Sequence, residues 1–447
     1  MCRLLDNRRG SVAFATVIAL IPLIGFVALG AEAGSWYVTK QHAQNAADAA
    51  AYSGALRLAC QLAGDTGVAC TDTTTVDYRG KQFAAQNAFC STGDTSYPGS
   101  ICPSLAAGTS QNVDIAVSGK QVTATVSQTQ PAYLAALLGL STVTIGATAV
   151  AEVDSPAKPP CILALADSIT GQGSPTVSSP TCGIASNKMT NDGISFTGNN
   201  GIQFNVPAYT AGGCTQTSAS GTQSTSVQTY QQAVPDPLSG LDAAMEALKT
   251  SDFPKGQCKV SAATPTLPAS YEAGQCYNAG NGNFPSSGTV TLSGTYYFSG
   301  NVKISGTPTI KSATSTGATL IFFGGATLSI TGNPIIQLTA MKSPSGPSVL
   351  SSVASLMKDL LIYDGEAYSK QGVNISGDSS SYFNGTVYVP NSPVTYGGNS
   401  SASAPSPGCY QVIAYAVNFQ GNTTLDNTGC ISDGAVTLNI QTVRLVQ

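Results

Sequence analysis

A long uncharged stretch near the N-terminus constrains this chain more than any other feature. Residues 12–31 are twenty consecutive residues without a charge, and Thr16 is their only strongly polar member. A helix rises ~1.5 Å per residue, so this run would span roughly 30 Å, the thickness of the hydrocarbon layer of a bilayer. The basic residues before it are Arg3, Arg8 and Arg9, whereas Glu32 follows directly. The positive-inside rule therefore predicts one transmembrane helix, with residues 1–11 as a cytoplasmic tail and the bulk of the chain exported.

A cleaved secretory signal is the alternative interpretation of this stretch. Ala31-Glu32-Ala33 has the small residues of a signal cleavage site. The apolar run is longer than the core of a usual signal peptide, however, and Trp36 and Tyr37 lie where an aromatic belt at a membrane surface would be found. We therefore expect the anchor to stay on the mature protein.

The composition fits an exported, multidomain protein. Charged residues make up 9% of the 447 residues and the net charge is -4, so no basic surface is available to neutralise nucleic-acid phosphates. The length predicts at least two domains. Twelve cysteines are ordinary for an oxidising compartment and many for a cytosolic protein.

The cysteines are spaced as loop-closing disulfides would be. Cys2 lies in the predicted cytoplasmic tail, which leaves eleven cysteines outside, an odd number. The neighbouring candidates are Cys60 and Cys70, Cys90 and Cys102, Cys161 and Cys182, Cys258 and Cys276, and Cys409 and Cys430. Spacing alone leaves the connectivity open. Cys214 is the candidate for the unpaired thiol.

The segment after the membrane run predicts a helix with a face of small residues. Residues 35–59 contain neither Gly nor Pro before Gly54. The small residues at helical spacing are Ala43, Ala47, Ala50 and Gly54, and such a seam permits close approach of a partner helix. The alternatives are that alanine serves here only as a good helix former, and that the seam packs against the three-stranded sheet of the same chain. Gly30 and Gly34 form a further small-residue pair at the outer membrane edge.

Alternating apolar residues then predict a small sheet. The period changes to two over residues 113–117, 122–126 and 143–149, with a short apolar helix at 132–138 before the last strand. Residues 32–153 are thus expected to form an α+β module with two or three helices over three strands. Residues 154–160, which contain three prolines, are expected to be a stiff linker.

Two motifs of this N-terminal part resemble a known family. They are the run from Arg9 into the apolar helix followed by Gln44-Asn45-Ala46-Ala47-Asp48-Ala49-Ala50-Ala51, and the segment at 131–151. Both are similar to TadG-like proteins of the Tad (Flp) pilus-assembly system. The resemblance implies a bacterial inner-membrane protein that takes part in the assembly or display of pili. Its implied partners are other pilus-assembly subunits in the membrane. A second copy of the chain is a further candidate partner.

The resemblance has two limits. Related pseudopilins are cut after a glycine and carry Glu at the fifth mature position, but the fifth residue after Gly10 is Ala15, so we expect no processing there. Some family members also carry a von Willebrand-type domain with an Asp-x-Ser-x-Ser metal motif. The segment at Asp167 lacks that spacing.

Residues 161–447 follow another pattern and are expected to form a mainly-β exported domain. An apolar residue, any residue, a second apolar residue, a polar residue and glycine recur in that order. The repeats begin at Ile194, Val290, Val302, Leu328, Val373 and Val417. Short strands with a glycine corner and no intervening helices favour a parallel β-helix, with a β-sandwich as the alternative.

The search for catalytic chemistry is mostly negative. His42 is the only histidine, which excludes a Ser-His-Asp triad in the exported domain, a His-rich zinc site and a HExxH protease. Asp364, Glu366 and Asp378 are the densest carboxylates for a glycosidase-like pair. We expect no enzyme, cofactor or metal. The alternative function is a surface protein that binds or cleaves carbohydrate. Glu32, at the membrane edge, is a candidate to pair with a partner subunit.

Overall fold

The chain forms two compact units, which are described separately. Among the described residues, one unit comprises those up to Asp154 together with those from Thr442 onward, and the other comprises Ser155–Gln441. The computed structural model describes residues 8–62, 70, 72–91, 93–94, 96–155, 158–173, 175–179, 181–197, 203–216, 227–260, 275–278, 282–365, 367, 372–377, 380–398, 408–420, 423–425, 427–433, 435–436, 438 and 440–446.

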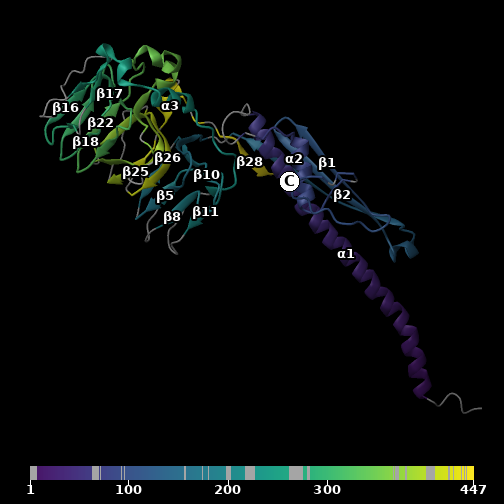
Figure 1. Cartoon of the computed structure of the whole chain (residues 1–447). Coiled ribbons are helices and arrows are strands. Elements are labelled where there is room, and N and C mark those ends of the chain that lie inside the picture. Colours follow the sequence, from purple (N-terminus) through teal and green to yellow (C-terminus); the bar gives the residue numbers. More distant parts are fainter. Residues whose placement is uncertain are drawn as a thin grey trace, which may run out of the picture. The chain divides into compact units, whose positions relative to one another are not determined.

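One continuous helix dominates the N-terminal unit. Helix α1 runs over Arg8–Leu62 and contains Pro22 (Figure 1). At ~1.5 Å per residue its 55 residues extend for about 80 Å. The N-terminal half is apolar and exposed, whereas the Ala-rich C-terminal half is packed against the rest of the unit.

A four-stranded antiparallel sheet covers the C-terminal half of α1. Its strands are β1 (Ser110–Ser118), β2 (Gln121–Pro131), β3 (Thr142–Asp154) and β28 (Thr442–Leu445), in the order β1-β2-β3-β28. Alternate residues of β2 and β3 are buried, as the period of two predicts. The helices of this unit beside α1 are α2 (Val76–Gln86) and the 3-10 helix η2 (Ala135–Leu138).

The fourth strand corrects the predicted domain boundary. Thr442–Leu445 pairs antiparallel with β3, from Thr442 opposite Asp154 to Leu445 opposite Ala151. Val443 is buried in the same core as the alanines of α1. Residues 442–445 therefore complete the N-terminal sheet and are not part of the exported β domain, and the sheet has four strands where three were expected.

The second unit is built from short strands. They are β4 (Pro160–Ala164), β5 (Ile169–Gln172), β6 (Thr176–Ser178), β7 (Gly183–Ser186), β8 (Ile194–Thr197), β9 (Gln203–Asn205), β10 (Ala208–Thr210), β11 (Cys214–Gln216), β12 (Val227–Gln228), β13 (Lys259–Val260), β14 (Cys276–Asn278), β15 (Gly282–Asn283), β16 (Thr289–Leu292), β17 (Gly294–Phe298), β18 (Val302–Ile304), β19 (Thr309–Ser312), β20 (Ala318–Phe322), β21 (Leu328–Ile330), β22 (Ile335–Thr339), β23 (Leu360–Asp364), β24 (Val373–Gly377), β25 (Tyr382–Gly398), β26 (Tyr410–Phe419) and β27 (Thr423–Thr424). Its helices are α3 (Ser239–Glu246), η3 (Thr250–Asp252), η4 (Pro254–Gly256), η5 (Ser348–Met357) and α4 (Thr428–Asp433).

Strand pairing in this unit is parallel and regular. Over much of the chain each strand pairs with the third strand after it: β4 with β7, β5 with β8, β6 with β9, β14 with β17, β15 with β18 and β16 with β19. Every described pair of this unit is parallel, which contradicts the alternative β-sandwich, because such sandwiches consist of antiparallel sheets. The apolar residues that open the six sequence repeats are all buried in one core.

Glycine is required where the corners of successive layers meet. Gly306 and Gly332 both have positive φ, at 84° and 87°. A Cβ added at Gly332 would lie 2.7 Å from the carbonyl oxygen of Gly306, so the two corners are in direct contact. Only a residue without a side chain allows this approach.

The order of the layers does not follow the chain. β26 pairs with β25 on one side, and on the other it pairs with β4 and β5, so that Val412 lies opposite Ile162. The chain thus enters the stack in its middle, builds β4 to β12 outward, and forms the remaining layers from β14 onward. β26 then closes the seam between the two parts.

Candidate functional site

The N-terminal half of α1 exposes a continuous apolar surface. It is the one described helix long and apolar enough to cross a membrane, and its most apolar window has a mean hydropathy of 2.1 with none of it buried. The large exposed side chains are Val17, Ile18, Leu20, Leu23, Ile24, Phe26, Val27 and Leu29. Exposing so much apolar surface to water is costly, so this half of the helix requires an apolar environment.

The alanine seam lies inside the protein. Ala43, Ala47 and Ala50 have no exposed surface, and they pack with apolar residues of β2, β3 and β28. A Cβ added at Gly54 would lie 3.0 Å from Cγ1 of Val122. This corrects the expectation that the seam contacts a partner helix, because its surface is already covered by the sheet of the same chain. Small residues let a sheet approach a helix as closely as they let another helix approach.

Glu32 is bound within the chain as well. Its Oε1 accepts a hydrogen bond from the backbone N–H of Tyr133 at 2.6 Å, and its Oε2 accepts from those of Leu134 and Ala135 at 3.1 Å each. These donors lie at the start of η2, where backbone N–H groups lack partners inside the helix. Lys40 donates to the carbonyl oxygen of Gly146 at the start of β3. Glu32, which was a candidate to pair with a partner subunit, therefore attaches the β2–β3 loop to α1.

The glycine pair at the end of the apolar run is open. A Cβ at Gly30 or at Gly34 would meet no atom within 4 Å. Unlike the alanine seam, this small-residue surface is available.

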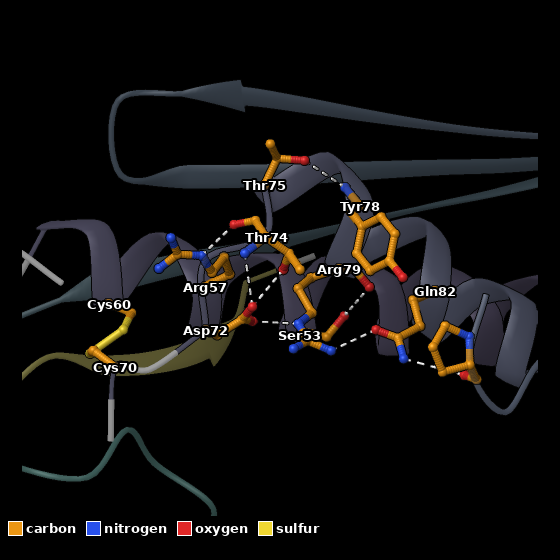
Figure 2. Close-up of polar contacts among 11 residues, drawn as sticks. Ser53, Arg57, Cys60, Cys70, Asp72, Thr74, Thr75, Tyr78, Arg79 and Gln82 are labelled. Carbon is orange, nitrogen blue, oxygen red and sulfur yellow. Dashed lines mark hydrogen bonds and ion pairs between the residues drawn. A yellow bond between two sulfur atoms is a disulfide. The ribbon is translucent and has the colours of Figure 1, made fainter. Parts of the chain in front are cut away.

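A polar network joins the C-terminal half of α1 to α2 (Figure 2). Arg57 donates to the carbonyl oxygen of Thr74 at 2.6 Å, and the Ser53 hydroxyl donates to that of Arg79 at 3.3 Å. Asp72 accepts hydrogen bonds from Arg79 and from both the backbone and the hydroxyl of Thr74. Burial acts to raise the pKa of Asp72, but the hydrogen bonds from Arg79 and Thr74 outweigh it and hold the pKa well below its usual range.

Five disulfides connect cysteines that are neighbours in the sequence. They are Cys60–Cys70, Cys90–Cys102, Cys161–Cys182, Cys258–Cys276 and Cys409–Cys430, the same pairs that the spacing favoured. Cys214 is the free cysteine among those described, and burial raises the pKa of its thiol. Cys2 lies outside the described residues.

A cavity of about 470 Å³ lies against α3 in the second unit. Two half-buried carboxylates line it: Asp236 accepts from the hydroxyl of Tyr388 at 2.7 Å, and Asp242 accepts from that of Tyr363 at 2.8 Å. Burial raises the pKa of both carboxyls, and the tyrosine hydrogen bonds offset part of the increase. The second oxygen of Asp236 accepts from the N–H of Leu238 at 2.9 Å. These contacts attach α3 and the segment before it to the stacked strands.

The predicted carboxylates do not form a site in the described part of the chain. Asp364 is fully buried, and its Oδ2 accepts from the hydroxyl of Thr327 and the N–H of Leu328, each at 3.0 Å. Glu366 and Asp378 lie outside the described residues. Among the residues that the structure describes, no three His, Cys, Asp or Glu side chains are grouped so that they could hold a metal ion.

Comparisons with known proteins identify the first of these regions. Residues 10–57 match the family model "Tad: Putative Flp pilus-assembly TadE/G-like". Residues 10–57 are thus similar to TadE/G-like proteins. This confirms the first of the two resemblances found in the sequence, and the match coincides with nearly the whole of α1, whereas the resemblance of residues 131–151 stays a prediction. No curated protein matches the chain.

One solved structure resembles the chain only weakly. It is the competence-associated pilin ComZ from Thermus thermophilus, at 10% identity over 76% of this chain and 83% of that one, with a TM-score of 0.26. A TM-score this low carries no argument about the fold. The TadE/G-like match of α1 is therefore the finding on which function is inferred.

Sequence reasoning missed three groups of residues. Glu32 was singled out, but the N–H groups of residues 133–135 give no sign in the sequence that they lie beside it. Asp236 and Asp242 belong to no recognisable motif, and the only local signal is that Asp236 is followed by a proline before a short helix. The partners of the TadE/G-like helix in the core, above all Val443, are far away in the chain, and no local signal could have found them.

Proposed function

We propose that this protein is a non-enzymatic component of a bacterial inner membrane that takes part in the assembly or display of Flp-type pili. The observation that carries the proposal is the TadE/G-like match of residues 10–57, which falls on a helix whose first half is apolar and exposed. In this proposal the helix crosses the membrane once. Its N-terminus is cytoplasmic, in accordance with the positive-inside rule.

The second unit is, in this proposal, a parallel β-helix displayed outside the membrane. The supporting observations are the parallel pairing of every third strand, the single apolar core inside the stack and the contact between the corners at Gly306 and Gly332. A rigid stack of this kind presents a long surface on one anchor, which suits a displayed or scaffolding part.

Partner subunits in the membrane are expected to contact the apolar half of α1. The alanine seam is covered by the chain's own sheet, whereas Gly30 and Gly34 are open and lie on neighbouring turns of one helix face. Small residues allow two helix backbones to come close in a membrane. The partners that fit this surface are the transmembrane helices of other pilus-assembly subunits or of a second copy.

The test replaces Gly34 by leucine and measures both crosslinked complexes in native membranes and the number of pili per cell. Overpacking at a close helix contact costs ~1–3 kcal/mol. Since ~1.4 kcal/mol is tenfold in an equilibrium, the yield of crosslinked complex should fall about tenfold. Gly25→Leu is the matched control, because Gly25 is an equally open glycine of α1 on the side of the helix opposite Gly34.

Equal yields and equal pilus numbers for Gly34→Leu, Gly25→Leu and the native chain would contradict the proposed contact. Normal pili in cells that lack the protein altogether would contradict the role in pilus assembly or display. Release of the protein from membranes by alkaline carbonate would contradict the anchor.

A further inference from the structure

The loop between β2 and β3 is compact and lies at the outer end of the apolar run. We name residues 132–141 the membrane-edge loop. Its ends are joined by a hydrogen bond from the N–H of Ala132 to the carbonyl oxygen of Ser141 at 3.1 Å. Gly139, with φ of 93°, ends η2, and the N–H of Leu140 donates to the carbonyl oxygen of Ala135 at 3.1 Å.

Glu32 determines where this loop lies. The three hydrogen bonds from residues 133–135 attach it to the first residue after the uncharged run 12–31. Lys40, two helical turns further, holds the start of β3. If the run spans the hydrocarbon layer, the membrane-edge loop lies at the level of the lipid headgroups, because Glu32 does.

The loop is apolar and uncharged, and it exposes two large side chains. Tyr133 is 73% exposed and Leu140 is 57% exposed, although both are large apolar side chains. The segment 121–151, which comprises β2, the loop and β3 as far as Ala151, contains no Asp, Glu, Lys or Arg. Two charged side chains of α1 contact it in the described part of the chain: Glu32, whose charge is met by backbone N–H groups, and Lys40, which donates to the carbonyl oxygen of Gly146. No charged side chain of this segment therefore opposes its insertion into the boundary between lipid headgroups and acyl chains.

We propose that the membrane-edge loop is a second membrane contact, which inserts Tyr133 and Leu140 into the headgroup and acyl boundary of the bilayer beside α1. The occupant of this apolar surface is lipid. The loop is attached at Glu32, directly after the exposed apolar run of α1, and Tyr37 and Val38, on other faces of the helix just beyond Glu32, are exposed as well. A tyrosine ring suits this depth because its apolar body and polar hydroxyl meet an environment of both kinds.

The consequence is a fixed orientation of the N-terminal unit. One helix crossing a bilayer leaves the attached unit free to tilt and rotate about it. A loop that is held to α1 by Glu32 and inserted beside it gives a second point of attachment. The ends of β2 and β3 that the loop joins then stay at the membrane, and the N-terminal unit faces its partners in a constant orientation. This inference rests on the membrane anchor of the proposed function.

The experiment places the chain's indole in the loop and measures its depth. In a Trp36→Phe background, which removes the only tryptophan, Tyr133→Trp is reconstituted as the full chain into phosphatidylcholine–phosphatidylglycerol vesicles with and without brominated acyl chains. We expect brominated lipid to quench the emission of Tyr133→Trp and the emission maximum to shift to the blue. Val117→Trp in the same background is the control, since Val117 is also an exposed apolar residue of the sheet. Val117 belongs to β1 and lies opposite Val122 at the other end of β2, roughly 30 Å from the loop at ~3.3 Å per residue.

A third variant tests the role of Glu32. Adding Glu32→Ala to Tyr133→Trp removes the acceptors of three loop N–H groups, so we expect the quenching to fall. Glu32→Gln retains one acceptor oxygen, so we expect the quenching to fall less in this variant.

Co-flotation of each variant with the vesicles separates the inference from the anchor. Variants that float with vesicles but show no more quenching for Tyr133→Trp than for Val117→Trp would overturn the inserted loop and leave the anchor standing. That outcome would assign the apolar loop to contact with protein. Failure of all variants to float would overturn the anchor and the loop contact together.

Discussion

At the scale of single residues, the two tyrosine–aspartate pairs of the second unit show how a buried carboxylate is tolerated. Tyr363 and Tyr388 are almost completely buried, and each donates its hydroxyl to a carboxylate beside α3. Burial penalises the charged carboxylate and raises its pKa, whereas a hydrogen bond to the charged form lowers the pKa again. The hydroxyls thus keep α3 attached at pH values where Asp236 is ionised.

We predict that Tyr388→Phe loosens α3 more at pH 7 than at pH 4. The folded-state pKa of Asp236 is raised, so its contribution to stability is full below the ordinary pKa and is lost as the pH rises through the folded value. Without the hydroxyl the pKa rises further and the loss at neutral pH grows, by about 1.5–3 kcal/mol for a hydrogen bond to a charged group. Hydrogen exchange of the amides in residues 238–248 measures it.

Tyr296→Phe is the control for this prediction. Tyr296 is equally buried, and its hydroxyl donates to the carbonyl oxygen of Ser293 at 3.0 Å, away from α3. It should leave exchange in residues 238–248 unchanged. A Tyr388→Phe effect of the same size at both pH values would show that the ionised carboxylate plays no part.

The alanine seam gives a second prediction at this scale. Ala47→Leu adds three carbon atoms where α1 meets the sheet without a gap, and overpacking costs ~1–3 kcal/mol. We expect a lower melting temperature of the N-terminal unit and an unchanged yield of crosslinked partners. Asn45→Leu, on the exposed face of the same turn, should change neither. A lost complex with an unchanged melting temperature would restore the seam as a partner surface.

At the scale of elements, disulfides hold short strands whose own hydrogen bonds are few. Cys161 and Cys182 are fully buried and connect β4 to the residue before β7, two strands that are also paired. A strand of three to five residues ends soon after it begins, so its ends are prone to fray. The covalent link keeps the layers in register at the seam that β26 closes.

We predict that replacing both cysteines of this pair by alanine lowers the free energy of unfolding of the second unit by ~2–4 kcal/mol, mainly by freeing the unfolded chain. Denaturant unfolding with tyrosine near-UV circular dichroism measures it, because the large buried aromatic side chains of this unit are tyrosine and phenylalanine. Peptide mapping without reductant checks the pairing first. Recovery of these cysteines as free thiols from the native envelope would contradict both statements.

At the scale of the whole molecule, the chain leaves the N-terminal unit after β3, builds the second unit and returns to pair with the strand it left. Thr442 lies opposite Asp154, although 288 positions separate them. Completion of the N-terminal sheet therefore needs residues 442–445, which follow the whole second unit in the chain. The chain therefore connects the two units twice, once after Asp154 and once before Thr442.

We predict that Val443→Asp destabilises the N-terminal unit, although it changes a residue far along the chain. The side chain is 2% exposed within the core of α1 and the sheet, and burying an unpaired carboxylate costs several kcal/mol. Limited proteolysis should then cut within residues 110–154, while the second unit resists. Leu445→Asp is the control, because Leu445 is exposed in the same strand. Equal protection of residues 110–154 in both variants would contradict the contribution of β28.

The sequence by itself determined the features that are written in local patterns. The uncharged run predicted the exposed apolar half of α1, the period of two predicted β1 to β3, and the repeated apolar residues followed by glycine predicted buried strands with tight corners. Local spacing also favoured the five disulfides, since loops of 10 to 21 residues bring neighbouring cysteines together. In each case the residues that interact are near one another in the chain.

Only the tertiary structure decided what each pattern packs against. A face of small residues fits a partner helix or a sheet equally well, and the structure places β2 and β3 on the alanine seam. The pairing of β26 with β4 and of β28 with β3 joins segments more than 240 residues apart, and a strand's pattern of side chains does not name its neighbour. The sequence did not reveal the partners of Glu32, because they are three backbone N–H groups. Every residue except proline has such a group, and only the fold places these three beside the carboxylate.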